Sequence, residues 1–431
     1  MWLRSANSIT EKNMKKLILL AGLCSSSLLA ASAQGQQELH FLHWWTSTGE
    51  VQSANLVKTE LAKHQIKVVD VPVRGGGGTP AKSILQARAI AGNPPELAQI
   101  EGPAIKAWAT LGFLHPLTSL AKDQQWEETL YPFVRSIQQY NGDYYAIPVT
   151  VHRLNWMWVN HNKLAEYQQT VPQTWEQLIT VFNALKQKGV MPLAIGNEPW
   201  QVGQLFENIA FSIGGQAFYQ KAFIELDADA LSSPSTYEAL SKFRQISNII
   251  GDKLIEQRWD QASQSLLRGD SVFQISGDWV AGELMSTTGE FPDSISCYPT
   301  PSKTASFLYN IDSFAFFNSA QLSETEALKV AGILSSKQFL HDFNLKKGSI
   351  PTRKDIELTG YNQCAVKSQQ DLQQAIQTGN VMPSIVDSMA VSPLIQKAAL
   401  NELFRFFNDP TVTSDDVILH LQNVSKTGIA F

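Results

Sequence analysis

Residues 39–50 carry the sequence LHFLHWWTSTGE, an apolar run that ends in a turn. The apolar part predicts a strand, and Ser47 with Glu50 three residues later has the spacing of a helix capping box. Trp44 and Trp45 therefore fall between a strand and a helix, where open α/β sheets bind ligands. An indole ring has a flat apolar face and one N–H donor, which suits a partly wet binding site. The alternative is that both tryptophans are core residues.

The chain after this stretch alternates between strand and helix patterns. Residues 66–73 (IKVVDVPV) and 96–100 (ELAQI) are typical of strands, and Pro80 opens a helix that runs to Ile90 between them. Such alternation predicts a parallel sheet with helices on its faces. Later segments predict further helices at 174–188, 205–213, 324–343 and 393–407, the first with Thr174 as N-cap. They also predict extended runs at 144–149, 271–275 and 307–316.

Length and charge narrow the class of protein. A chain of 431 residues is too long for one hydrophobic core, so two domains are expected. A net charge of -5 with no basic run argues against binding to nucleic acid or to an anionic membrane surface.

The first residues have the pattern of a signal peptide. Lys15 and Lys16 precede an apolar run that is too short to span a bilayer, and residues 31–33 (ASA) predict cleavage after Ala33. Met14 is then the expected start, and Leu23 before Cys24 argues against a lipid anchor. We expect an exported, soluble protein.

Cleavage would leave two cysteines, Cys297 and Cys364. In an oxidising compartment two cysteines predict a disulfide, and two buried free thiols are the alternative. Neither has a Cys or His neighbour at ligand spacing, so no zinc site is expected.

The motifs of common enzymes are absent from the sequence. The four-glycine loop at 75–78 resembles a phosphate-binding loop, but Ala81 replaces the second glycine and Pro80 lacks an N–H. We therefore predict a flexible turn into a helix. No HExxH, CxxC or strand-linked GxSxG occurs, so we expect a binding protein with no catalytic residue, metal or cofactor. A spatial pair of carboxylates for glycoside hydrolysis stays open.

Several motifs, in order, resemble one known family. Three of these motifs are the leader, the Trp-Trp pair and the glycine loop running to residues 92–95 (GNPP). The others are 152–156 (HRLNW), 199–201 (PWQ), 277–279 (GDW), 309–313 (YNIDS) and 347–351 (KGSIP). Together they resemble the family 1 extracellular solute-binding proteins of bacterial ABC sugar importers, most of all the periplasmic glucose/mannose-binding branch. The resemblance spans almost the whole mature chain.

The resemblance implies two α/β lobes that close on a mono- or oligosaccharide, with crossover hinges near Pro148, Ser302 and Pro351. After the leader at 1–33, the N-terminal lobe would comprise 34–148 plus 303–351 and the C-terminal lobe 149–302 plus 352–431. The resemblance also strengthens the expectation of a disulfide between Cys297 and Cys364. The implied sugar contacts are Trp44, Trp45, Glu50, Trp200, Trp279, Asp312 and Lys347. Tryptophans would cover ring faces while the charged groups bond to hydroxyls.

Two positions depart from the glucose-binding pattern. Glu101 stands where those proteins carry a lysine, and Asp387 where they carry a histidine. Both are added to the predicted sugar contacts, and they suggest a positively charged ligand such as an amino sugar. The alternative is a neutral sugar of another shape, with these carboxylates accepting from hydroxyls or pairing with Lys347 and Arg353.

The expected partners are a small sugar and the permease subunits of an importer, and the protein is expected to be a periplasmic monomer. Two alternatives remain from the sequence. One is a sensory protein that acts on a membrane receptor, and the other is an exported glycoside-active enzyme.

Overall fold

The computed structural model describes residues 38–251 and 258–426, which form an α/β structure as predicted. The expected start at Met14 and the cleavage after Ala33 lie outside these residues. Within them, no helix has the length and apolarity needed to cross a membrane.

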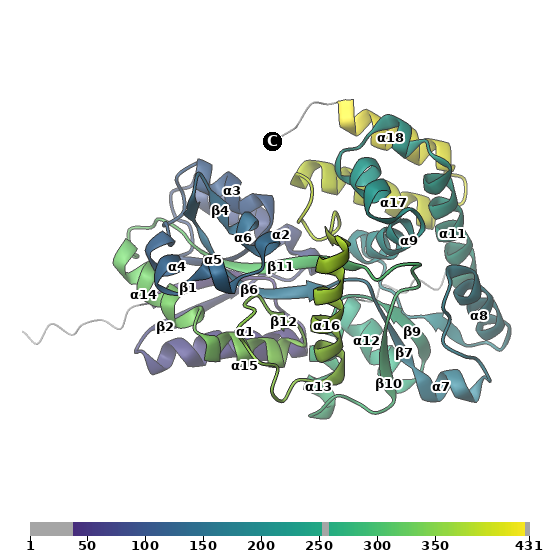
Figure 1. Ribbon diagram of the computed structural model, residues 1–431, viewed down its shortest axis with the longest axis horizontal. Coiled ribbons are helices and arrows are strands. Elements are labelled where there is room, and N and C mark those ends of the chain that lie inside the picture. The colour runs from purple at the N-terminus through teal and green to yellow at the C-terminus, as the bar shows by residue number, and fades with distance from the viewer. Residues whose placement is uncertain (1–37, 252–257, 427–431) are drawn as a thin grey trace, which may run out of the picture. The chain divides into compact units, whose positions relative to one another are not determined.

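A seven-stranded sheet contains the first strand (Figure 1). Its main path runs β12-β6-β11-β3-β1-β2, and β13 pairs with β11. The parallel pairing predicted for the first three strands is confirmed, since β1 is parallel to both β2 and β3, whereas β11 is antiparallel to β3 and β6. The strands are β1 (Glu38–His43), β2 (Lys67–Pro72), β3 (Leu97–Glu101), β6 (Ala146–Arg153), β11 (Phe307–Phe316), β12 (Ile350–Pro351) and β13 (Val381–Pro383).

Helices cover both faces of this sheet because successive side chains of a strand point to opposite faces. On one face, Leu39 and Phe41 share a core with α1 (Thr48–Lys63), α14 (Glu324–Leu334) and α15 (Lys337–Lys347). On the other, Leu42 packs with α2 (Thr79–Ile90) and α3 (Pro103–Thr110).

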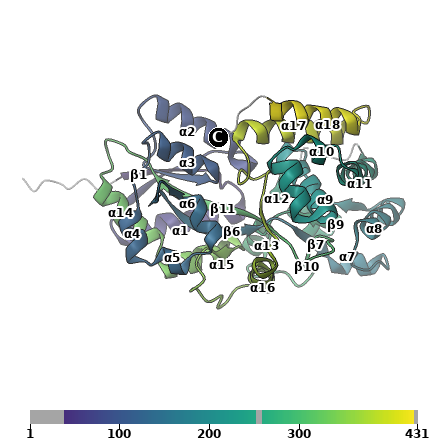
Figure 2. The same cartoon turned by 45° about the horizontal axis from the view of Figure 1, so that its top comes forward.

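A four-stranded sheet, in the order β10-β7-β9-β8, forms a separate core with a group of long helices (Figure 2). Its strands are β7 (Trp156–Asn160), β8 (Met191–Leu193), β9 (Ser271–Ile275) and β10 (Ile295–Pro299). The helices are α8 (Trp175–Gln187), α9 (Pro199–Tyr219), α11 (Pro234–Ile250), α17 (Pro393–Asn408) and α18 (Ser414–Lys426).

The described residues form further helices and strands. They are α4 (Thr118–Asp123), α5 (Trp126–Thr129), α6 (Pro132–Gln138), β4 (Gln139–Tyr140), β5 (Asp143–Tyr144), α7 (His161–Glu166), α10 (Ala228–Leu231), α12 (Trp259–Arg268), α13 (Trp279–Thr288), α16 (Gln363–Thr378), a 3₁₀ turn (Gly76–Gly78) and a π-helix (Gln220–Ile224). The chain passes between the two sheets from β6 to β7 and from β10 to β11. The predicted residue bounds of the lobes stay a prediction.

Two predicted helices differ from the structure. The helix expected at 205–213 begins at Pro199 and continues to Tyr219, because the chain returns to helix after a kink at Gly215, where φ is +70°. The helix expected at 324–343 is divided into α14 and α15. Ser335 ends the first, and the Ser336 hydroxyl caps the second by accepting from Phe339 N, so a new helix starts there.

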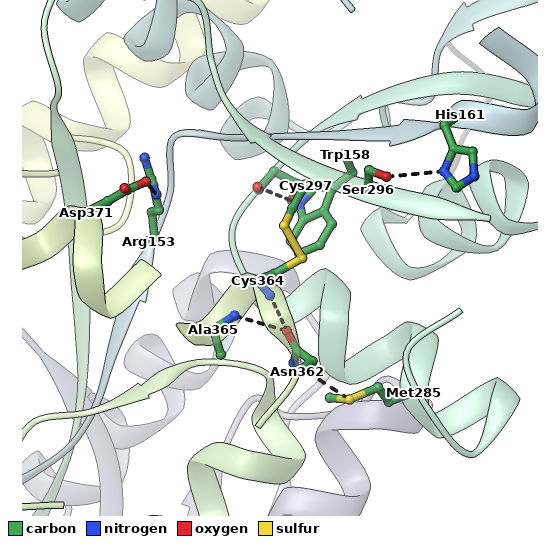
Figure 3. Close-up of a disulfide and its surroundings, with 11 residues drawn as sticks. Arg153, Trp158, His161, Met285, Ser296, Cys297, Asn362, Cys364, Ala365 and Asp371 are labelled. Atoms are coloured by element: carbon green, nitrogen blue, oxygen red, sulfur yellow. Dashed lines mark hydrogen bonds and ion pairs between the residues drawn. A yellow bond between two sulfur atoms is a disulfide. The ribbon is translucent and has the colours of Figure 1, made fainter. Parts of the chain in front are cut away.

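The predicted disulfide is present (Figure 3). Cys297 in β10 is bonded to Cys364 at the start of α16, with the Cα atoms 6.0 Å apart. Because α16 also contacts β11, β12 and β13, the bond connects the smaller sheet to a helix that lies on the larger one. The alternative of two free thiols is wrong.

Candidate functional site

A cavity of about 180 Å³ lies where elements of the two sheets meet. It is lined by all nine residues that the sequence predicted as sugar contacts, namely Trp44, Trp45, Glu50, Glu101, Trp200, Trp279, Asp312, Lys347 and Asp387. They come from segments far apart in the chain: Glu101 and Asp312 lie in β3 and β11 of the seven-stranded sheet, and Trp279 follows β9 of the four-stranded sheet. The other lining residues include Arg74, His152, Glu198, Arg258, Trp259, Asp260 and Asn310.

Aromatic rings form much of the wall. Trp279 begins α13 and stands at 6.0 Å, centroid to centroid, from Trp200 at the start of α9. It lies 6.4 Å from Trp259, which the sequence analysis missed because nothing in its local pattern distinguishes it from a core residue. The indole N–H of Trp279 is buried and has no partner in the described chain. The cavity therefore has flat apolar walls with a free donor among them.

Trp45 is mostly a core residue, which was the alternative for the Trp-Trp pair. Only 1% of its surface is exposed, and its ring packs at 5.8 Å from Phe314 and 5.3 Å from Phe343. Trp44 points to the other face of the sheet, where the Lys82 ammonium lies 5.2 Å from the ring centroid.

The capping box predicted at the start of α1 is confirmed. The Ser47 hydroxyl accepts from Glu50 N, and Glu50 Oε2 accepts from the backbone of Thr46 and Ser47. The other oxygen, Oε1, accepts from Lys347 Nζ at 3.1 Å. Glu50 is thus neutralised by Lys347 at the edge of the cavity.

A buried histidine that lines the cavity is bonded to two aspartates. His152 Nδ1 lies 2.5 Å from Asp278 Oδ1, and Nε2 lies 3.2 Å from Asp312 Oδ2. Burial by itself lowers the pKa of His152, but the two carboxylates outweigh it and raise the pKa to about 9. For Asp312, burial acts in the opposite direction and would raise the pKa. The hydrogen bond and the charge of His152 outweigh it and lower the pKa of Asp312 to about 2. His152 is therefore a cation at neutral pH and compensates Asp312.

Glu101 is paired with a cation that the sequence analysis did not identify. Its Oε2 accepts from Lys82 Nζ at 2.8 Å, and its Oε1 accepts from Asn310 Nδ2 at 2.9 Å. Burial raises the pKa of Glu101, and Lys82 opposes the shift. Lys82 follows the glycine loop, but only the fold shows that α2 places it beside β3.

The pairing of Glu101 and Asp387 with Lys347 and Arg353, one alternative from the sequence, is not found. Lys347 binds Glu50, and Arg353 binds Asp355 at 2.9 Å. The side-chain oxygen Oδ2 of Asp387 is buried without a hydrogen-bond partner in the described chain. No cluster of three or more potential metal ligands occurs among the described residues.

The chain matches known proteins along nearly its full length. Residues 46–331 match the family described as bacterial extracellular solute-binding protein. A probable sugar-binding periplasmic protein of Brucella suis is 32% identical over 95% of this chain and 98% of its own, and one of Mesorhizobium japonicum is 31% identical with the same coverage.

Solved structures show the same fold at low identity. A chitin oligosaccharide binding protein superposes with a TM-score of 0.76 and 15% identity, covering 90% of this chain and 98% of that one. Maltose-bound MalE3 of T. maritima superposes with a TM-score of 0.70 and 15% identity over 90% of this chain and 99% of its own. The fold is thus the two-lobed α/β fold of periplasmic binding proteins. By sequence and by fold, the chain belongs to the family of bacterial extracellular solute-binding proteins.

Proposed function

We propose that this protein binds a sugar in the tryptophan-lined cavity and delivers it to the membrane permease subunits of an ABC importer. The observation that carries the proposal is that all nine residues predicted as sugar contacts line one cavity, and that they come from segments beside both sheets. Its volume of about 180 Å³ lies below the ~300–1,000 Å³ of sites for drug-sized ligands, which favours a ligand of one sugar ring.

Unpaired polar atoms support a hydroxylated ligand. Trp279 Nε1, Asn310 Oδ1 and Asp387 Oδ2 are buried, line the cavity, and have no partner in the described chain. Burying a polar group without a hydrogen bond is costly, so a ligand with donors and acceptors around an apolar ring would stabilise this arrangement. A sugar has both, and its apolar ring face would lie against the indoles.

The relatives support the role. The Brucella and Mesorhizobium proteins are described as sugar-binding and periplasmic. As a member of their family, the chain is an exported binding protein. We further propose cleavage after Ala33, a periplasmic monomer, no nucleic-acid partner and no catalytic activity. The sensory and glycoside-active alternatives are tested by the uptake and aryl glycoside assays below.

Calorimetry on the mature protein tests sugar binding. Glucose, glucosamine, N-acetylglucosamine and a neutral disaccharide are titrated, and we expect saturable binding of at least one monosaccharide. Trp279→Ala should weaken it at least tenfold, because the ring that lies against the ligand is lost. Trp108→Ala is the matched control, since Trp108 packs against Phe113 and Phe317 away from the cavity.

Absence of binding by every saccharide would overturn the proposal. So would turnover of an aryl glycoside by the purified protein. Uptake of labelled sugar by cells with and without the gene separates import from sensing.

A further inference from the structure

We infer that the ligand carries a cationic amino group, as glucosamine does, and that Asp387 is the residue that selects it. This inference rests on the proposed sugar-binding function and names its ligand class. It assigns selection to one carboxylate, whereas the sequence pointed equally to Glu101 and Asp387.

The first step is the charge balance of the cavity. Four of its carboxylates lie within ion-pair distance of a cation: Glu50 with Lys347 at 3.1 Å, Glu101 with Lys82 at 2.8 Å, Asp312 with His152 at 3.2 Å, and Asp260 with Arg258 at 2.6 Å. A fifth, Glu198, accepts from Trp200 Nε1 at 3.1 Å and from Gln201 Nε2 at 2.6 Å.

Asp387 differs from all of these. It is 5% exposed, and its Oδ2 meets no donor in the described parts of the chain. Lys82 is the nearby cation, but its ammonium is already bound to Glu101 Oε2, Ser388 Oγ and Gly77 O, at 2.8, 2.8 and 3.2 Å. A buried carboxylate without a partner is unfavourable, so the protein leaves an acceptor for a positive group from outside.

The backbone around Asp387 is held in place by a second buried carboxylate. Glu207 in α9 accepts from Ser384 Oγ at 2.8 Å and from Ile385 N at 2.7 Å, and Ser384 Oγ in turn accepts from Asp387 N at 3.0 Å. Tyr219 OH donates to Glu207 at 2.5 Å. Glu207 is therefore a positioning residue that keeps Asp387 at the cavity wall.

Electrostatics give the inference a distinct signature. Burial, followed by the charges of Glu101 and Glu207, raises the pKa of Asp387 well above its ordinary value, against the opposing charges of Lys82 and His152. Asp387 therefore binds a proton more readily in the free protein than an exposed aspartate does. An ammonium at Asp387 lowers this pKa again, so binding releases protons, and affinity for the cationic sugar rises with pH while the ligand amine stays charged. A neutral sugar would instead accept a hydrogen bond from protonated Asp387, without proton release and with affinity that falls as pH rises.

Titration calorimetry tests this on the mature protein. Glucosamine, glucose and N-acetylglucosamine are compared at one pH in two buffers of different ionisation enthalpy, which gives the protons released. We expect glucosamine to bind tightest, with proton release. In Asp387→Asn the preference for glucosamine over glucose should fall about 10- to 100-fold, the value of one charge-assisted hydrogen bond.

The double variant Glu101→Gln, Lys82→Met is the matched comparison, because it removes an ion pair and frees no cation to bind Asp387. This change should alter the affinities for glucosamine and glucose by similar factors. An equal loss of preference in this variant and in Asp387→Asn would overturn the assignment to Asp387. The wild-type protein could instead bind N-acetylglucosamine or glucose as tightly as glucosamine, with no proton release. That result would overturn the inference of a cationic ligand, while the proposed sugar-binding function would stand. Because proton release is measured on wild-type protein, the test holds even if a variant fails to fold.

Discussion

At the scale of single residues, Gly78 shows how the backbone shapes the cavity wall. Its φ is +71°, and a Cβ there would lie 2.8 Å from the Trp44 ring. We expect Gly78→Ala to displace the Trp44 ring and weaken ligand binding. Because alanine is strained in the left-handed backbone conformation, the variant should also lose about 1 kcal/mol of the free energy of unfolding. Gly92→Ala is the control: its φ is +72°, but no described atom lies within 4 Å of its Cβ. Urea unfolding and calorimetry measure both effects, and equal ligand affinities in the two variants would contradict the prediction.

At the scale of elements, the disulfide between β10 and α16 keeps these two segments together when the chain unfolds, which lowers the entropy of the unfolded state. Cys297 and Cys364 are 67 positions apart, a loop for which the chain-entropy relation gives about 4 kcal/mol of stabilisation. We expect the free energy of unfolding of the double variant Cys297→Ala, Cys364→Ala to be about 4 kcal/mol lower than that of the wild type. Sugar affinity should persist, since neither cysteine lines the cavity. Denaturant unfolding with and without a thiol reductant provides the control. A wild-type midpoint that does not respond to complete reduction would contradict this role.

At the scale of the whole molecule, the cavity has two walls, each formed by segments that follow strands of one sheet. Trp44 follows β1 of the seven-stranded sheet, and Trp279 follows β9 of the four-stranded one. A sugar held by both walls favours the closed arrangement, because it binds that arrangement better than an open one. We expect the radius of gyration from solution scattering to decrease when saturating sugar is added. The decrease should disappear in Trp279→Ala and remain in Trp108→Ala. No change in saturated wild-type protein would contradict closure about the predicted hinges.

Local signals were enough to predict much of the fold. The strand at 307–316, the Thr174 N-cap and the Ser47–Glu50 capping box lie where the sequence placed them, because strand periodicity and helix caps depend on residues close together in the chain. The same locality explains the errors. Apolar periodicity continues across Ser335, so it did not reveal that this segment is two helices. The glycine pair at 214–215 predicted a helix end, but the chain returns to helix after the kink at Gly215.

The sequence by itself, with the family resemblance, identified nine of the residues that line the cavity and the two cysteines that pair. Only the tertiary structure decided how the charges are matched. Lys82 neutralises Glu101, and two aspartates raise the pKa of His152. Trp45 belongs mainly to the core, and Asp387 Oδ2 has no partner among the described residues. The physical reason is that charge compensation depends on distances of a few ångströms between groups far apart in the chain, and on burial, which strengthens each interaction and raises the cost of each unpaired group.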